Sequence, residues 1–179
     1  MKIYILKTDI DNYRGCYLKK TLVDRKIFRK LNKGNELTLT PEIQLEYDKE
    51  NTNPVGDICE CYDFTAYFIN SKCKTIFLGI PRFNIQFISI NDDFILCNNL
   101  EVIDSLDKHK TKFKYFESDI FGVEQYFFKD YDYPPLFQVK LPNSLIIRDY
   151  LVTNDFVRIV NDNNLKGFLF EEVWDSEKD

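Results

Sequence analysis

Histidine, glycine and long apolar runs are all scarce in this chain of 179 residues. His109 is the only histidine, and it sits in a charged stretch that we expect to be exposed. A serine or cysteine nucleophile usually needs a positioned base, so no catalytic residue is predicted. The six glycines are not grouped, which excludes a glycine-rich phosphate loop. The lack of a long uncharged apolar run predicts that no segment spans a membrane.

The cysteines also argue against a metal or cofactor site. The chain has five, an odd number at scattered spacings, which is typical of reduced thiols: Cys16, Cys59, Cys61, Cys73 and Cys97. The Cys59-x-Cys61 pair lacks the two-residue spacing of a zinc or redox motif. We therefore predict buried structural thiols, with no cofactor and no metal. The N-terminus is charged too early for a secretory signal, so we expect a cytoplasmic protein.

Aromatic residues, by contrast, are plentiful. They make up 16% of the chain, with 16 Phe and 11 Tyr, and aromatic side chains fit strands well. The length fits one domain. We predict a single α+β domain (1–179), with a mixed, mainly antiparallel sheet and a few short helices packed on it. Residues 1–56 form a more variable strand and helix part. Residues 57–179 hold two strand–helix–strand units that flank antiparallel strands.

The C-terminal unit has the clearest pattern. It predicts a strand at 145–152, a helix at 154–163 and a strand at 168–174. Thr153 or Asn154 offers a side-chain oxygen that can cap the helix, and Gly167 allows the turn into the last strand. Four apolar residues are expected to be buried together: Phe156, Val160, Phe168 and Phe170.

Residues 68–90 have the same layout, with a helix expected near 71–79. Laid on the C-terminal unit without a gap, Ile69, Asn70, Cys73, Phe77, Ile85 and Phe87 fall on Val152, Thr153, Phe156, Val160, Phe168 and Phe170. Identities are few, so duplication and convergence on one packing solution both stay open. Two such units predict helices packed on a mixed sheet.

The remaining chain is mostly strand-like. Alternation or apolar content predicts strands at 2–7, 37–47, 94–97, 112–116, 123–128 and 136–140. The pair at 112–116 and 123–128 is expected to be antiparallel, connected by 117–122. Residues 17–31 have helical spacing, 48–56 read as a polar loop, and 100–107 as a turn or one helical turn.

Four segments of the C-terminal half resemble a known family. Residues 151–156 and 165–174, preceded by 94–107 and 135–139, look like the closing part of immunity family eleven. Proteins of that family are encoded beside bacterial polymorphic toxins and are thought to neutralise them. The resemblance implies a binding protein, not an enzyme, whose partner is a cognate toxin domain.

The charge balance bears on the partner. A net charge of −5 and a pI near 5.0 make nucleic acid an unsuitable direct partner, because phosphate contacts need clustered Lys and Arg. The same balance suits a basic toxin domain. Two alternatives stay open: a small hydrolase-like enzyme that uses carboxylates in a deep pocket, and a regulatory or structural subunit. The oligomeric state is not predicted.

Two acidic segments are the predicted partner-binding residues. Asp130, Tyr131, Asp132 and Tyr133 alternate charge with aromatic rings ahead of two stiffening prolines, a composition typical of interface hot spots. Glu171, Glu172 and Asp175 extend this acidic surface. Glu171 and Glu172 are not a catalytic pair, because neighbouring residues of a strand point to opposite faces. Two alternatives stay open: the acids are plain solubility charges, and the tyrosines fold back onto the core.

Overall fold

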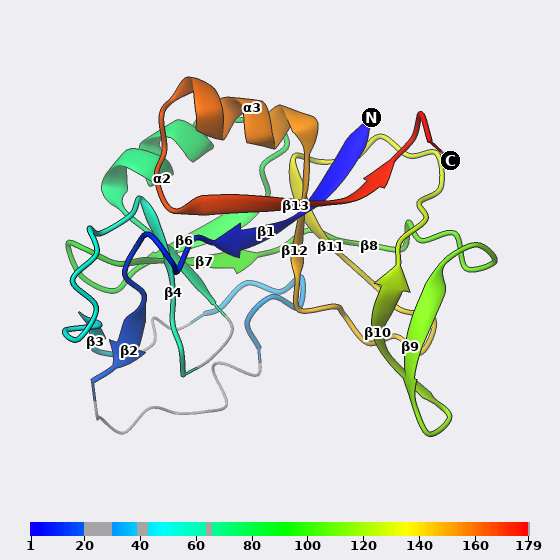
Figure 1. Ribbon diagram of the computed structural model, residues 1–179, viewed down its shortest axis with the longest axis horizontal. Coiled ribbons are helices and arrows are strands. Elements are labelled where there is room, and N and C mark those ends of the chain that lie inside the picture. The colour runs from blue at the N-terminus through cyan, green and yellow to red at the C-terminus, as the bar shows by residue number, and fades with distance from the viewer. Residues whose placement is uncertain (20–29, 39–42, 64–65, 179) are drawn as a thin grey trace.

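The computed structural model describes residues 1–19, 30–38, 43–63 and 66–178, and within them the chain has the predicted α+β fold (Figure 1). Strands dominate, and most neighbours pair antiparallel. The elements are β1 (Lys2–Thr8), β2 (Cys16–Leu18), β3 (Leu45–Tyr47), β4 (Ile58–Glu60), β5 (Tyr67–Ile69), α2 (Ser71–Leu78), β6 (Ile85–Ser89), β7 (Ile95–Asn99), β8 (Val102–Ile103), β9 (Lys112–Phe116), β10 (Asp119–Gln125), β11 (Leu136–Val139), β12 (Tyr150–Thr153), α3 (Asn154–Asp162) and β13 (Phe168–Asp175).

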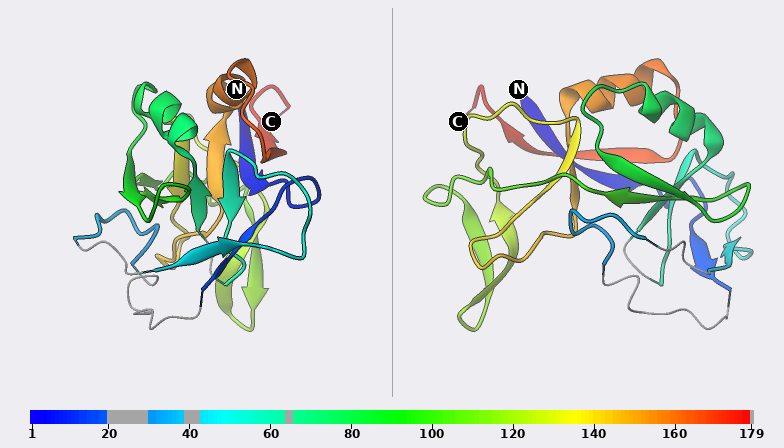
Figure 2. Two further views of the ribbon diagram at one scale, coloured as in Figure 1. Left: turned by 90° about the vertical axis from the view of Figure 1, so that its left-hand side faces the viewer. Right: turned by 180° about the vertical axis from the view of Figure 1, so that it is seen from behind.

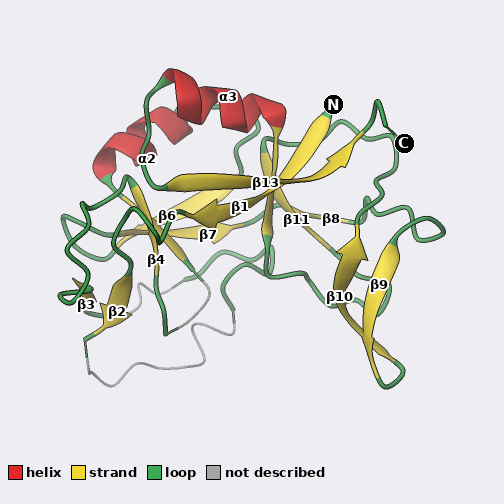
Figure 3. Cartoon of the chain, viewed as in Figure 1, coloured by secondary structure: helices red, strands yellow, loops and turns green. Residues whose placement is uncertain are grey.

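A five-stranded sheet, in the order β13-β1-β12-β11-β8, runs through the middle of the molecule. Its N-terminal strand β1 lies between the two strands of the C-terminal unit and pairs antiparallel with both. A second sheet has the order β4-β5-β7-β6. Both helices lie side by side at one end of the molecule, as the colouring of Figure 3 shows. The chain therefore folds as one domain, with its first strand inside the five-stranded sheet.

The two strand–helix–strand units share one topology. In the first, β5 and β6 both pair antiparallel with β7, and in the second β12 and β13 both pair antiparallel with β1. Each helix thus connects two parallel strands across an antiparallel strand. The predicted overlay holds in the helices, where the buried residues are Cys73 and Phe77 in α2, and Phe156 and Val160 in α3.

The helices close the largest apolar core, which fills the space between the two sheets. The rings of Phe77 and Phe156 lie 5.3 Å apart between the helices, and those of Tyr67 and Tyr150 lie 4.9 Å apart between the sheets. Phe156 and Val160 are fully buried as predicted. Phe168 and Phe170 pack against this core but stay half-buried, because β13 is an edge strand of its sheet.

Two further cores cover the outer faces. Phe137 and Leu151, on the other face of the central sheet, pack with Val123 of the β9–β10 hairpin. Phe68 and Leu96, on the far face of the second sheet, pack with Cys16 of β2. Alternation along each strand explains the division, since successive side chains point to opposite faces of a sheet.

The helix caps differ from one unit to the other. Asn70 caps α2, because its side-chain oxygen accepts a hydrogen bond from the Cys73 amide at 3.0 Å. Thr153 precedes α3 without a side-chain capping bond, and Asn154 instead accepts from the Lys2 amide at 3.2 Å. The predicted side-chain cap of α3 is therefore wrong. Gly167 has the positive φ of 86° that its turn requires, as predicted.

Several predicted boundaries are also wrong. β12 begins at Tyr150 instead of residue 145, and 100–107 contains the short strand β8 where a turn or one helical turn was expected. A two-residue turn joins β9 to β10, so the second strand begins at Asp119, earlier than expected. Tyr17 and Leu18, the first residues of the predicted helix 17–31, lie in the strand β2 instead. The rest of that predicted helix, 20–29, and residues 39–42 of a predicted strand lie outside the described residues.

Candidate functional site

The predicted segment 130–133 is a loop between β10 and β11, and only part of it faces solvent. Asp130 and Tyr131 are exposed. Asp132 pairs with Arg82 at 2.6 Å, and its carbonyl accepts a second bond from that guanidinium at 2.7 Å. Both side chains are well exposed, so this ion pair adds little stability. Its effect is to hold the loop against the segment that follows α2.

Tyr133 is buried, and its ring is therefore not open to a partner. The ring lies 5.3 Å from that of Phe137, and its hydroxyl donates to the Lys129 carbonyl at 2.6 Å. Burial raises the pKa of Tyr133 to about 12. Its place in the predicted binding surface is thus a correction: the ring has folded back onto the core, because the loop must cover the apolar face of β11.

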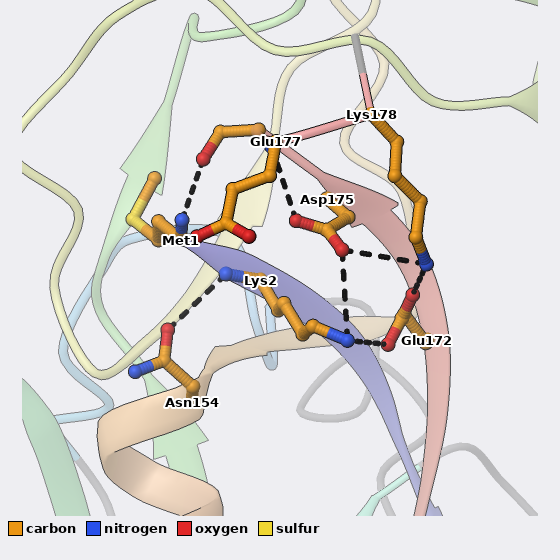
Figure 4. Close-up of polar contacts among 8 residues, drawn as sticks. Met1, Lys2, Asn154, Glu172, Asp175, Glu177 and Lys178 are labelled. Carbon is orange, nitrogen blue, oxygen red and sulfur yellow. Dashed lines mark hydrogen bonds and ion pairs between the residues drawn. The ribbon is translucent and has the colours of Figure 1, made fainter.

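The acids of β13 are neutralised by lysines within the chain (Figure 4). Glu172 pairs with Lys2 at 2.7 Å and with Lys178 at 3.1 Å. Asp175, whose side chain is nearly buried, pairs with the same two lysines at 3.5 and 3.3 Å. Hydrogen bonds from Lys2 and Lys178 lower the pKa of Glu172, and an amide bond from Glu177 lowers that of Asp175.

Glu171 lies on the opposite face of β13 and pairs with Lys7. The expectation that Glu171 and Glu172 point apart is confirmed by these separate partners. The terminal amine also donates to Ser176 Oγ at 2.5 Å, so the network joins the first and last strands of the chain. These acids fasten the two termini together, which leaves them poorly suited to attract a partner.

The structure brings the two predicted segments onto one aromatic cluster. Phe128 lies 5.8 Å from Tyr133 and 5.4 Å from Trp174, measured between ring centroids. Tyr131 packs on Tyr133 at 5.2 Å. Of the seven predicted residues, Asp130 and Tyr131 therefore remain exposed without an ion pair to the described residues.

A cleft of about 860 Å³ opens elsewhere, and the sequence did not predict it. One wall is the loop 144–148 and the other comprises 31–33 and 60–63. Glu60 lines it from the inner face of β4, half-buried, and accepts a bond from Thr8 Oγ1 at 3.3 Å. Burial raises the pKa of Glu60, and the charge of Asp149 raises it further.

Buried amides build the floor of this cleft. Gln138 accepts a bond from Asn99 at 3.0 Å and donates to the Ile147 carbonyl at 2.8 Å. The backbone N–H of Asn32 donates a hydrogen bond to Asn98 Oδ1 at 2.9 Å. These bonds join the two sheets to both walls. Single buried amides look like ordinary polar residues in a sequence, so no local signal marked the cleft.

The β9–β10 hairpin projects away from the helices (Figures 1 and 2). Asn143 of the adjoining loop donates to the Ile120 carbonyl at 2.6 Å, which fixes the hairpin to the cleft wall. Three of its rings are largely in solvent: Tyr115 is 59% exposed, Phe116 72% and Phe121 59%. In the sequence this exposed aromatic surface corresponds to aromatics that alternate with lysines, but such alternation also fits a half-buried strand.

Among the described residues, no group of three or more His, Cys, Asp or Glu side chains is arranged to hold a metal ion. Neither α2 nor α3, the helices within the described ranges, is long and apolar enough to cross a bilayer.

No protein-family model matches the chain, and a search of curated proteins finds no match. The resemblance to immunity family eleven therefore stays a prediction from the residues that carry it.

Proposed function

We propose that this protein is an immunity protein, which binds a cognate toxin domain and neutralises it without catalysis. The exposed rings of the β9–β10 hairpin are the observation that carries this proposal. A folded chain gains by burying such rings, and exposed apolar surface on one element is typical of a protein interaction site. Tyrosine and phenylalanine are also enriched in the centres of interfaces.

Charge and resemblance support the same conclusion. The net charge of −5 suits a basic partner, because opposite charge speeds encounter and excludes wrong partners. The C-terminal motifs that resemble immunity family eleven fall on β12, α3 and β13, which lie in the central sheet and its covering helix. The proposal places the protein in the cytoplasm, where it would meet the toxin that its own cell makes.

Co-expression with the neighbouring gene product tests this function. The polypeptide encoded beside this gene is expressed in a bacterial host with and without this protein, and growth is followed. We expect arrest by the neighbour alone, rescue by co-expression, and a complex that co-elutes in gel filtration. A neighbour that is harmless, or toxic but neither bound nor rescued, would contradict the proposal.

A carboxylate enzyme is the second candidate, and Glu60 is the observation that favours it. A half-buried acid with a raised pKa inside a large cleft is a feature of general acids. Glu60→Gln distinguishes the two functions, since it keeps the shape of the side chain and removes its proton transfer. A binding protein keeps full protection in this variant, whereas an enzyme that relies on Glu60 loses it.

A further inference from the structure

We infer that the tip of the β9–β10 hairpin, residues 115–121, is the element that enters the partner, and that the partner presents a basic concave surface. The inference rests on the proposed function and adds the contact element and the chemistry of its partner. It differs from the surface predicted from sequence, which the ion pairs of β13 and the burial of Tyr133 have largely removed.

The hairpin is anchored at its base and through Ile120, and its remaining tip side chains are exposed. Phe113 and Val123 are register partners near the base, and both pack into the core beneath the central sheet. Phe116 pairs with Asp119 directly before the turn, and its ring is 72% exposed. The rings of Tyr115, Phe116 and Phe121 are exposed toward the tip, whereas Ile120 of the same segment packs against the core.

Two acids lie at the tip of the hairpin, and a third, Glu124, lies near its base. Glu117, in the turn, and Asp119, next to it, form no ion pair with any described residue. Lys112 and Lys114 lie nearer the base, where the charge of Lys114 acts on Asp149. The tip therefore joins exposed rings to two unpaired carboxylates, the combination that complements a basic surface.

One strand of the tip is fastened to the neighbouring loop before binding. Only two residues form the turn, and Glu117 has a φ of 53°, in the left-handed region that favours glycine. The bond from Asn143 to the Ile120 carbonyl fixes the second strand. A preformed element loses less conformational entropy on binding, so its rings supply contact area at low cost.

The acidic tip also separates the possible occupants. A second copy that met this chain tip to tip would bring Glu117 and Asp119 against their own counterparts, and like charges in contact are repulsive. Nucleic acid would meet the same repulsion from its phosphates. A basic protein surface is the occupant that satisfies both the rings and the carboxylates.

Two variants, each with a matched control, test the inference against the neighbouring toxin domain in a surface plasmon resonance assay. Phe116→Ser removes the most exposed ring, and its control is Leu78→Ser on α2, which is 67% exposed. Glu117→Lys/Asp119→Lys reverses the tip charge. Its control is Asp11→Lys/Asp162→Lys, two exposed acids elsewhere that change the net charge by the same amount.

We expect Phe116→Ser to weaken binding about 30-fold through faster dissociation, the size of an interface hot spot. The tip charge reversal should slow association about tenfold, and added salt should reduce the difference. Both controls should bind like wild type. Circular dichroism and urea midpoints should be unchanged in all four variants, because the altered side chains are exposed.

If wild type binds the toxin and rescues growth, and both tip variants bind as well as wild type, the inference is overturned. The proposed function then stays intact. Absence of binding by wild type would overturn both. Analytical ultracentrifugation adds the remaining outcome: a wild-type dimer that Phe116→Ser converts to a monomer would overturn the inference in favour of a second copy.

Discussion

The hydroxyl of Tyr150 donates a hydrogen bond to Asn32 Oδ1, which joins buried residues 118 positions apart in the chain. Asn32 Oδ1 also accepts a hydrogen bond from the backbone N–H of Asn99 at 3.1 Å. The backbone N–H of Asn32 donates to Asn98 Oδ1. Asn32 has a φ of 56°, and asparagine tolerates this left-handed conformation better than most residues. One side chain thus fastens the segment after residue 30 to strands of both sheets.

We expect Asn32→Ala to lower the free energy of unfolding by about 3 kcal/mol, because it leaves the buried Asn99 backbone N–H unpaired, removes one of two acceptors of the Tyr150 hydroxyl and puts alanine at a strained φ. Tyr150→Phe should cost about 1 kcal/mol, since Asn32 keeps its bond from Asn99. Urea denaturation measures both. Tyr131→Phe is the control on an exposed ring, and an equal loss in that variant would show that the effect is not due to burial.

Phe156→Ala should cost about 3–5 kcal/mol, the usual range for a large aromatic removed from a core, because the ring is fully buried. Phe170→Ala should cost about half as much, since its ring is half-buried at the edge of the sheet. Urea midpoints of the two variants give the comparison. Equal losses would mean that β13 is buried more deeply in solution.

The thiols should be inert in the native protein. All five cysteines are free and buried, and burial raises the pKa of the Cys73 and Cys97 thiols well above the ordinary 9.0. At about pH 8 the thiolate is the reactive form, so we expect slow reaction with Ellman's reagent when folded and five thiols per chain in guanidinium. Tyr115→Cys is the positive control and should react at once.

Stability should fall in acid because of the terminal network. The pKa of Glu172 and of Asp175 is lower in the folded protein than the ordinary values of 4.5 and 3.8, so the unfolded chain binds these protons first. The stability that these two carboxylates contribute is present above pH 4.5. It is lost as pH falls through their pKa values in the folded protein.

Lys2→Met removes a cationic partner of both acids. The free energy of unfolding, measured by urea titration at a series of pH values, should therefore fall less steeply in acid than it does in wild type. Lys140→Met, which removes an exposed lysine that forms no ion pair with the described residues, is the control. If the stability of Lys2→Met falls as steeply in acid as that of wild type, the network contributes nothing to the pH dependence of stability.

Glu60 should have the opposite effect. Its pKa is raised in the folded protein, so the folded state binds the proton more tightly and wild type loses stability as pH rises from 4.5 through the folded value. Glu60→Gln has no charge to bury and still accepts the bond from Thr8. We expect it to be more stable than wild type at pH 7 and equal to it in acid, by thermal denaturation at both pH values.

Local features were predictable from sequence. The overlay of Cys73 and Phe77 on Phe156 and Val160 identified the buried face of both helices, because apolar spacing along a helix fixes which side chains share a face. Gly167 marked its turn, since few other residues adopt a positive φ. Abundant aromatics and alternating strands gave the α+β class and the mainly antiparallel pairing.

Only the tertiary structure decided which strands pair and which charges are free. Nothing local in β1 shows that it lies between β12 and β13, and Lys2 neutralises Glu172 from 170 residues away. Tyr133 is buried while Phe116 is exposed, although each lies in an aromatic-rich, charged stretch. Periodicity reports the face on which a residue lies, whereas burial and ion pairing depend on what the distant chain places against that face.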